Sequence, residues 1–392
     1  MTTVVRTFLL LLFFAPICRA QQADFEEIKI GILGEFEPTS AQVIIEFGHY
    51  AVWADGKKIA ARDPRQRITF VKRGSKTEVS LPEKVLGTFT NVELVSTRSD
   101  GVFRLYLLKP LRRERVYDDH LIIASTAGSL QFINRVNLEK YIAGVVEAES
   151  GKEKGAEYYM AQAVISRTYA LSNRRRYLKY GYNLNDRTDC QVYHGKARWE
   201  PAIIEAVRST EGLVLTDSEM NLITAAFHSN SGGHTVSSAA VWSGALPYLS
   251  PRRDDFSLEG DHFAWDSARS REEWLTYLRR RHKLDTDNDS IRRQVLHFVQ
   301  PLRTEWFADP AFGIELREIR KDFGLNSTWF DLTSDADSVY FTGRGFGHGT
   351  GLSQEGAMRM AALGFSYTDI LHFYYNDVHI IDLRSIGFFR ED

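Results

Sequence analysis

The chain has 392 residues, of which 43% are hydrophobic, and its formal net charge at pH 7 is −2. This length and composition predict a globular protein of one to three domains with a substantial hydrophobic core. The near balance of charges gives no support for a general nucleic-acid-binding protein. We therefore interpret the basic runs at 173–179 and 278–283 as solvated helix faces.

The N-terminal segment has the pattern of an export signal. A short basic region precedes an apolar run over residues 8–14, and a small-residue cleavage site ends at Ala20. We expect residues 1–20 to be a signal peptide and the mature protein to be exported to the periplasm, the cell surface or the extracellular space. A lipoprotein anchor at Cys18 is the alternative, but Ile17 is larger than the residue that such processing usually accepts.

Residues 21–133 are expected to form a β-rich region. Short runs of β-branched and aromatic residues alternate there with turn sequences such as ADGK and RSDG. Nothing in this region suggests a catalytic constellation, so a scaffold or wall-contact role is expected. The strands are predicted at 27–33, 42–47, 67–73, 92–96, 102–108 and 120–125.

Helical periodicity begins near residue 134, and a charged stretch around 256–335 is interpreted as a surface insertion. The chain is therefore predicted to be an α+β protein, in which the β-rich region packs beside a mixed helix and strand catalytic domain over 134–392. The main elements expected in that domain are helices at 137–149 and 156–171, strands at 212–217 and 222–229, and two C-terminal helices separated by Gly364.

Four familiar motifs are not matched. The sequence at 285–296 begins like a calcium loop, but Ser290 replaces its turn glycine and Leu296 replaces its bidentate acid. The glycine-dense segment 343–351 contains neither a G-x-G-x-x-G frame nor a Walker lysine. A serine hydrolase is not indicated either, because the chain has no G-x-S-x-G elbow.

The helix predicted over 137–149, with Asn137 as its N-cap, ends in two glutamates. By helical spacing Glu149 continues the apolar face, whereas Glu147 points to solvent. Loss of hydration raises the pKa of such a carboxyl group, as a general acid requires. The alternative is that Glu149 lies at the end of the apolar face and forms an ion pair with an arginine such as Arg167. The residues of the apolar face are Leu138, Tyr141, Ile142, Val145 and Val146.

Four motifs from about 134 to 383 resemble, in the same order, those of the SpoIID/LytB family, which comprises stage II sporulation protein D and amidase enhancers. They are LEKYIAGVVEAESG, DCQVYHG, FHSNSGGHT and GRGFGHGTGLSQEGA. The resemblance implies a lytic transglycosylase that cuts peptidoglycan glycan strands stripped of their peptides. It also implies that Glu149, the third residue after GVV, is the essential glutamate.

Two other functions stay open. The enhancer label of the family implies a non-catalytic peptidoglycan-binding protein that recruits or stimulates a cell-wall amidase as its partner. A metal-dependent wall hydrolase is the other alternative. Nucleic acid is not expected as a partner in any of these cases.

Two small-residue segments, at 227–235 and 343–354, are expected to bind the substrate. For the first segment the alternative is a tight turn between strands. For His348 in the second segment the alternative is a structural hydrogen bond. Glycine at every second position from 343 to 351 lets a glycan approach the backbone closely. Arg167, on the apolar side of its helix, is expected to bind a structural or substrate partner. The remaining substrate-binding candidates are Ser229, Ser231, the amides of Gly232 and Gly233, His348, Gly349, Gln354 and Ser353, which is also expected to cap the next helix.

Cys190 and His194 are candidate zinc ligands because they lie four residues apart in a predicted loop. A third ligand would have to come from elsewhere, with His228 or His234 as the obvious choice. The alternatives for Cys190 are a nucleophilic thiol and a buried bystander. No cofactor is required for the expected activity, and zinc is the metal for which candidate ligands are present.

Overall fold

The structure is a computed structural model that describes residues 27–242 and 244–383. The predicted signal peptide at 1–20, with the alternative anchor at Cys18, lies outside these residues. The chain divides into two compact units, and none of the described helices is long and apolar enough to cross a membrane. The first unit runs to Tyr141 and includes Tyr177–Asp186, and the second comprises Ile142–Arg176 and the chain from Arg187 onward.

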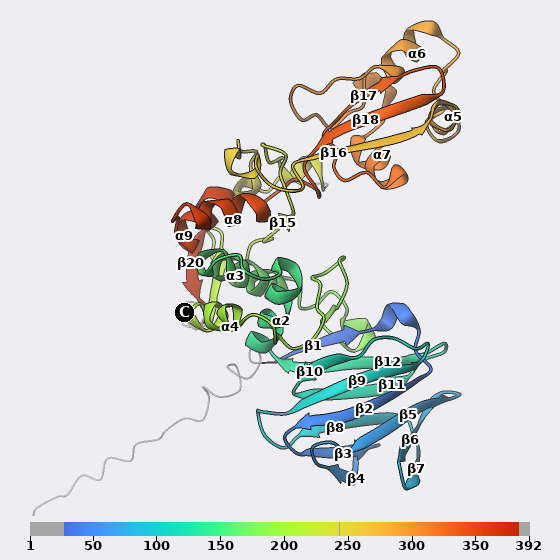
Figure 1. Ribbon diagram of the computed structural model, residues 1–392, viewed down its shortest axis with the longest axis vertical. Helices are drawn as coiled ribbons and strands as arrows, with labels where there is room; N and C mark the ends of the chain where they lie inside the picture. Colours follow the sequence, from blue (N-terminus) through green and yellow to red (C-terminus); the bar gives the residue numbers. More distant parts are fainter. Residues whose placement is uncertain (1–26, 243, 384–392) are drawn as a thin grey trace, which may run out of the picture. The chain divides into compact units, whose positions relative to one another are not determined.

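The first unit is built from two β-sheets (Figure 1). The seven-stranded sheet has the order β13-β1-β12-β11-β8-β3-β4, and the six-stranded sheet has the order β10-β9-β2-β5-β6-β7. Neighbouring strands are antiparallel except β1 and β13, which are parallel. The strands are β1 (Glu27–Ile32), β2 (Ser40–Phe47), β3 (Tyr50–Ala54), β4 (Lys57–Arg62), β5 (Arg67–Arg73), β6 (Lys76–Leu81), β7 (Lys84–Phe89), β8 (Asn91–Ser96), β9 (Val102–Lys109), β10 (Arg115–Asp118), β11 (His120–Ser125), β12 (Leu130–Asn137) and β13 (Leu184–Asn185).

Alternate side chains of these strands form the core of the first unit. In β2, for example, Ala41, Val43 and Ile45 are buried while their neighbours are not, as a half-buried strand requires. Tyr50 of β3 lies edge-on against Phe103 of β9, with 6.3 Å between ring centroids, so the two sheets pack face to face. The predicted β-rich N-terminal region is therefore confirmed.

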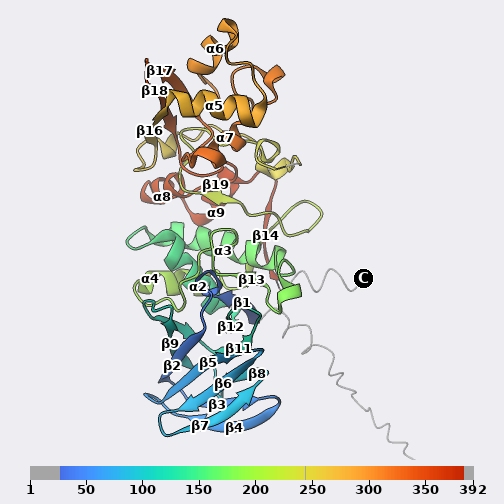
Figure 2. The same ribbon diagram turned by 90° about the vertical axis from the view of Figure 1, so that its right-hand side faces the viewer.

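The second unit mixes helices with short strands (Figure 2). Helices α3, α8 and α9 pack together, and three small sheets pair β14 with β20, β15 with β19, and β18 with both β16 and β17. The predicted α+β class is confirmed. The elements are α2 (Leu138–Ser150), α3 (Ala156–Ser172), α4 (Pro201–Ser209), β14 (Leu213–Thr216), β15 (Phe227–His228), β16 (Ala264–Ser270), α5 (Arg271–His282), α6 (Asp289–Leu296), α7 (Leu316–Phe323), β17 (Phe330–Ser334), β18 (Ser338–Arg344), β19 (Leu352–Ser353), α8 (Gln354–Ala362), α9 (Tyr367–Tyr374) and β20 (His379–Asp382).

The charged stretch around 256–335 is more than a surface insertion, which corrects the prediction. Together with β18 it has a hydrophobic core of its own, centred on the fully buried Trp274. The indole contacts Phe307, Phe323 and Phe341, with centroid distances of 5.4, 5.4 and 5.6 Å. The charges that dominate its composition lie on the outer faces of amphipathic helices, so composition alone concealed this core.

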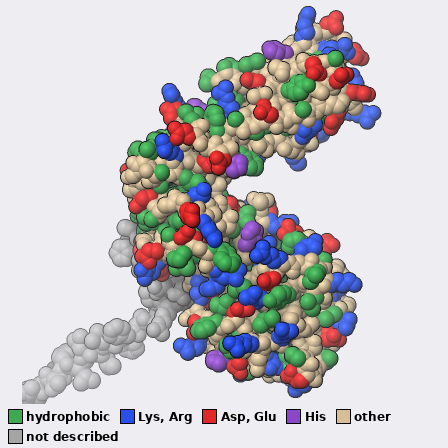
Figure 3. All heavy atoms as spheres, viewed as in Figure 1, with side chains coloured by type: hydrophobic (Ala, Val, Ile, Leu, Met, Phe, Trp, Pro, Cys, Tyr) green, Lys and Arg blue, Asp and Glu red, His purple; other side chains and the backbone are tan. Residues whose placement is uncertain are grey.

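The basic run at 278–283 falls mostly in the last turn of α5, where its side chains make surface ion pairs. Arg281 lies 3.6 Å from Glu318 and 3.9 Å from Asp322. Basic and acidic side chains are interspersed over the face of the molecule shown in Figure 3. This segment is a solvated helix face, as the near balance of charge predicts.

Candidate active site

Helix α2 begins and packs as the sequence predicts. The side-chain oxygen of Asn137 accepts hydrogen bonds from the backbone N–H groups of Glu139 and Lys140 at 3.0 and 3.2 Å, so Asn137 is the N-cap. All five residues of the predicted apolar face are buried. This burial sets the rotation of the helix and thereby directs its last turn.

Glu149 lies in that last turn and is desolvated. Its Oε1 accepts a hydrogen bond of 2.7 Å from the backbone N–H of Val192. Burial raises the pKa of the Glu149 carboxyl, and the Val192 hydrogen bond opposes this shift without cancelling it. No charged side chain contributes to the shift, so a pairing with Arg167 does not set the protonation of this group.

A cluster of neutral polar groups begins beside Glu149 at Tyr158. Burial raises the pKa of the Tyr158 phenol, Ser150 lowers it, the Glu149 carboxylate raises it further and Gln354 lowers it, so these groups are neighbours. Ser150 and Gln354 act on Tyr158 as hydrogen-bonding groups, so the three side chains form one buried polar cluster, although Tyr158 Oη, Ser150 Oγ and Gln354 Nε2 make no well-formed hydrogen bond among the described residues. Buried polar atoms without partners are costly. These three are therefore the atoms that a polar ligand beside Glu149 would satisfy.

Glu147 does not simply face solvent, which corrects the second half of the glutamate prediction. One of its carboxylate oxygens accepts from the N–H of Trp199 at 2.6 Å, and both accept from the N–H of Arg198 at 2.9 and 3.1 Å. The two glutamates therefore bind the backbone of the same long segment, Arg187–Glu200, at two places. Glu147 anchors that segment, and Glu149 receives its Val192 N–H.

Arg167 lies in the interior of the second unit. Its side chain is fully buried, and Nη1 donates a hydrogen bond of 2.9 Å to the carbonyl oxygen of Leu213. The adjacent Thr168 hydroxyl accepts from the N–H of Leu215 at 2.9 Å. Both side chains of α3 hold strand β14 in place, which supports the structural alternative for Arg167.

The segment FHSNSGGHT forms a tight turn whose donors are used internally. Ser231 donates to Asp254 Oδ2 at 2.7 Å and is fully buried. The Gly232 amide donates to Asn230 Oδ1 at 2.7 Å, and the Gly233 amide donates to Ser257 Oγ at 3.0 Å. These donors already have partners within the protein, which supports the tight-turn alternative for this segment.

Ser229 differs from its neighbours in this turn. Its side chain is half-buried, and its hydroxyl makes no hydrogen bond with the described residues. Its carbonyl oxygen accepts from the N–H of Glu355 at the start of α8. Ser229 is therefore the one candidate of this segment whose side chain is still available to a ligand.

The glycine-rich segment leads into helix α8 through Ser353. The Ser353 hydroxyl accepts from the N–H of Gly356 at 3.4 Å, which confirms the predicted N-cap, and from the N–H of Ser231 at 3.2 Å. Because Ser353 is fully buried, its role is structural rather than substrate-binding. Gln354 follows it and points its unpartnered amide toward Tyr158.

We expect Ser353→Ala to lower the free energy of unfolding by about 1 kcal/mol, because the hydroxyl caps α8 and also holds the turn at Ser231. Urea unfolding followed by circular dichroism measures this change. Ser229→Ala is the matched control, since its hydroxyl has no partner to lose among the described residues. Equal stability of the two variants would contradict the capping role.

His348 is half-buried and held by its own loop. Its Nδ1 accepts from the N–H of Thr350 at 3.1 Å, and its ring lies 5.4 Å from that of His228 and 5.8 Å from that of Trp242. Burial and the nearby Arg320 guanidinium lower the pKa of His348 to about 4, so the ring is neutral at physiological pH. Gly349 is buried beside it, and a substrate contact for either residue stays a prediction.

Comparison with known proteins agrees with the four motifs. The family model described as stage II sporulation protein (SpoIID) matches residues 126–216, which contain Glu149. Stage II sporulation protein D of Bacillus amyloliquefaciens is 30% identical over 269 residues, which are 64% of this chain and 76% of that protein. The chain belongs to the SpoIID/LytB family. The B. subtilis (strain 168) protein of the same name is 29% identical over 265 residues, which are again 64% of this chain and 76% of that protein.

A second kind of SpoIID/LytB relative is the amidase enhancer of B. subtilis (strain 168). It is 28% identical over 289 residues, which are 60% of this chain but 39% of that protein. The shared part is therefore a minority of the enhancer. The family resemblance predicted from the sequence is confirmed, and both branches of the family are represented among the relatives.

In this SpoIID/LytB protein the two zinc candidates have different surroundings. Cys190 is buried and His194 is exposed. His228 packs against His348 instead, and His234 Nδ1 lies 2.7 Å from the carbonyl oxygen of Thr235. Across residues 27–242 and 244–383, no group of three His, Cys, Asp or Glu side chains could hold a metal ion. Zinc binding by Cys190 and His194 therefore stays a prediction without a third ligand among the described residues.

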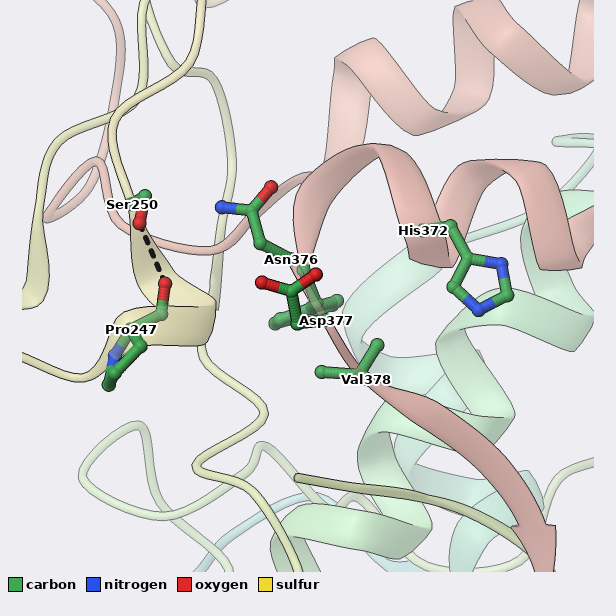
Figure 4. A pocket seen from close by; sticks show the side chains of 7 residues that line it. Pro247, Ser250, His372, Asn376, Asp377 and Val378 are labelled. Carbon is green, nitrogen blue, oxygen red and sulfur yellow. Dashed lines mark hydrogen bonds between the residues drawn. The ribbon is translucent and has the colours of Figure 1, made fainter. Parts of the chain in front are cut away.

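The pocket in Figure 4 has a volume of about 680 Å³ and belongs to the second unit. Its wall is polar, and within it the Ser250 hydroxyl donates to the Pro247 carbonyl oxygen at 2.7 Å. Neither Glu149 nor any other predicted site residue lines it. It is lined by Pro247, Ser250, His372, Tyr375, Asn376, Asp377 and Val378.

Proposed function

We propose that this protein is an exported peptidoglycan lytic transglycosylase that prefers glycan strands without peptides and uses Glu149 as its single acid and base. The observation that carries this proposal is the Glu149 carboxyl group. Its pKa is raised by burial, and the buried phenol of Tyr158 lies beside it. Family membership supports the substrate class, because the relatives include sporulation and amidase-enhancer proteins.

The proposed reaction needs one carboxyl group. Protonated Glu149 donates its proton to the glycosidic oxygen, and the bond from that oxygen to the anomeric carbon of muramic acid breaks. The C6 hydroxyl of the same sugar attacks the anomeric carbon, and the Glu149 carboxylate takes the hydroxyl proton. The product is a 1,6-anhydro sugar, and no water is consumed. A hydrolase would instead need a second carboxyl group to act on water or on the sugar.

The surroundings of Glu149 fit this single-acid scheme. Because Oε1 accepts from Val192, the carboxyl orientation is fixed and Oε2 is left to carry the proton. No second carboxylate contributes to the Glu149 pKa. Tyr158, Ser150 and Gln354 supply neutral groups that would bind sugar oxygens without lowering that pKa through charge.

The test is a digestion of purified glycan strands, both peptide-free and peptide-bearing, with the mature protein. Mass spectrometry of the products scores 1,6-anhydromuramic ends. We expect these ends from peptide-free strands first. Strands that stay intact although the protein binds them, or products with reducing ends, would overturn the proposed reaction.

A role as an amidase enhancer is the second candidate function, and the enhancer relative is the observation that favours it. Its test is the rate of a cell-wall amidase on intact peptidoglycan with and without this protein. An enhancer that acts by binding alone stimulates the amidase equally as the wild type and as the Glu149→Gln variant. A glycan-cleaving enzyme stimulates it only when Glu149 is present.

We expect kcat to fall as the pH rises through the raised pKa of Glu149. The protonated form is the proton donor, and burial preserves that form to a higher pH than in an exposed glutamate. The rate of anhydro-end formation across the acidic to mildly alkaline range measures this. Glycan binding by the Glu149→Gln variant over the same range reports any other titrating group. A rate that climbs steadily with pH would contradict the role of Glu149 as an acid.

A further inference from the structure

Four basic side chains lie together beside the glycine-rich segment 343–351. Arg303 and Arg320 both lower the pKa of His228 and of His348, and Arg320 lowers that of Arg303, which places all four within electrostatic reach of one another. No acidic side chain contributes to the pKa of any of them. Neither arginine makes an ion pair with any residue that the structure describes.

Arg303 is held in place but is not satisfied. Its Nη2 donates to the carbonyl oxygen of Ser231 at 2.9 Å, and its guanidinium lies 5.3 Å from the ring centroid of Trp329. A Cβ atom at Gly349 would overlap Nη1, so the glycine is what allows this placement. Nε and Nη1 are buried without a partner, and burial together with Arg320 lowers the Arg303 pKa to about 9. A buried charge without an anion is strongly unfavourable.

Arg320 approaches the same place from helix α7. Its Nε donates to the carbonyl oxygen of Asn326 at 3.3 Å, and the Gly347 amide donates to that same oxygen at 2.9 Å. This shared acceptor ties α7 to the glycine-rich segment. Arg320 and Arg303 are both half-buried as whole residues, although Nε and Nη1 of Arg303 are themselves buried, so a ligand from solvent would meet the outer part of this pair first. Trp242 lies beside His348 and is 37% exposed, which gives the cluster an aromatic edge.

We propose that Arg303 and Arg320 bind a carboxylate carried by the glycan, while Trp242 stacks on the sugar that bears it. The identity of the glycan rests on the proposed function. In a peptide-free strand the lactyl group of muramic acid ends in a carboxylate, whereas in a peptide-bearing strand the same carbon is a neutral amide. Two guanidinium groups attract the carboxylate and gain little from the amide. The site would therefore select strands without peptides.

The basic cluster and Glu149 are connected through one short segment. His348 and Gln354 are six residues apart, so their Cα atoms are separated by about 21 Å at most. Gln354 is a neighbour of Tyr158, which in turn lies beside Glu149. A glycan strand of several sugars is long enough to span this distance.

The test measures binding by calorimetry to protein carrying Glu149→Gln, which leaves the strand uncut. The ligands are a peptide-free peptidoglycan oligosaccharide, the same oligosaccharide with its lactyl carboxylates converted to amides, and chitotetraose. We expect the acid to bind about tenfold or more tightly than the amide. Adding Arg320→Met should abolish this preference and leave chitotetraose binding unchanged.

Arg344→Met is the matched control, because Arg344 also lies 5.3 Å from the Trp329 ring centroid but does not act on either histidine. It should keep the preference for the acid. Arg303→Met is the second test variant, used once circular dichroism shows that it folds, since Arg303 also holds the Ser231 carbonyl. Its preference for the acid should be lost as well.

Two results would overturn the inference. One is equal binding of acid and amide by the parent protein, and the other is an Arg344→Met variant that behaves like Arg320→Met. Inorganic phosphate that raises the melting temperature only when Arg320 is present, and that the oligosaccharide does not displace, would overturn the assignment to a glycan. Failure of the proposed function looks different, because strands would stay uncut while the preference for the acid persisted.

Discussion

Glu149→Gln is expected to reduce the formation of 1,6-anhydromuramic ends by about 10²- to 10⁴-fold, the range typical for loss of a general acid and base. Glutamine keeps an oxygen that can accept the Val192 N–H, so the geometry of the last turn of α2 is retained while the proton is lost. Mass spectrometry of digested glycan strands measures the rate. Binding of the uncut strand should persist.

Glu147→Gln is the matched control, since this neighbouring glutamate is on the same helix and its oxygens accept the N–H groups of Arg198 and Trp199. A glutamine oxygen can still accept from that backbone, so cleavage should fall only a few-fold. Equal losses from the two substitutions would mean that both glutamates act by anchoring the segment Arg187–Glu200. That outcome would remove the chemical role from Glu149.

The Glu149→Gln substitution should also change how the free energy of unfolding depends on pH. A glutamate whose pKa is raised on folding binds more protons in the folded than in the unfolded state. Its contribution to stability is therefore present below its unfolded pKa of about 4.3 and is lost as pH rises through the folded value. At neutral pH, Glu149→Gln should be more stable than the wild type, and the difference should shrink in acid. Urea unfolding at both pH values measures it.

Gly144→Ala is expected to lower the free energy of unfolding by about 1–2 kcal/mol, although alanine favours helices over glycine by about 1 kcal/mol. A Cβ atom at Gly144 would overlap the Gly195 carbonyl oxygen and come within 2.6 Å of the Tyr193 ring. Steric overlap therefore outweighs helix propensity. Tyr193 and Gly195 follow Val192, whose N–H group binds the Glu149 carboxyl group. Displacing them should move that N–H group, so cleavage should also fall by about tenfold or more.

Gly128→Ala is the control for this substitution, because a Cβ atom there meets open space and its φ is not positive. It should change neither unfolding nor cleavage appreciably. Urea unfolding and the glycan digestion together separate the two effects. A stable Gly144→Ala variant with full activity would show that the segment after Val192 moves aside freely, so that its position does not matter to Glu149.

Local patterns in the sequence were sufficient for the elements that carry their own signals. The five apolar positions of α2 and the Asn137 cap predicted the helix and placed Glu149 on its buried face. The Ser353 cap and the two helices on either side of Gly364 were predicted correctly for the same reason. In the β-rich unit, six strands were found. The strands β4, β6 and β7 were missed because small and charged residues weaken their alternating pattern. The strands β3, β10, β12 and β13 were also missed, and β12 continues to Asn137, past the point where helical periodicity was predicted to begin.

Contacts between residues distant in the chain were decided only by the tertiary structure. The sequence could not show that the amides of Gly232 and Gly233 would donate hydrogen bonds within a tight turn. Nor could it show that Arg167 would donate to the Leu213 carbonyl oxygen. Nor did any local signal mark Arg303 or Arg320, which lie in a charged stretch with no motif. A helical period fixes which face of α2 is apolar, but a charge without its counter-ion becomes visible only when folding has brought its neighbours around it.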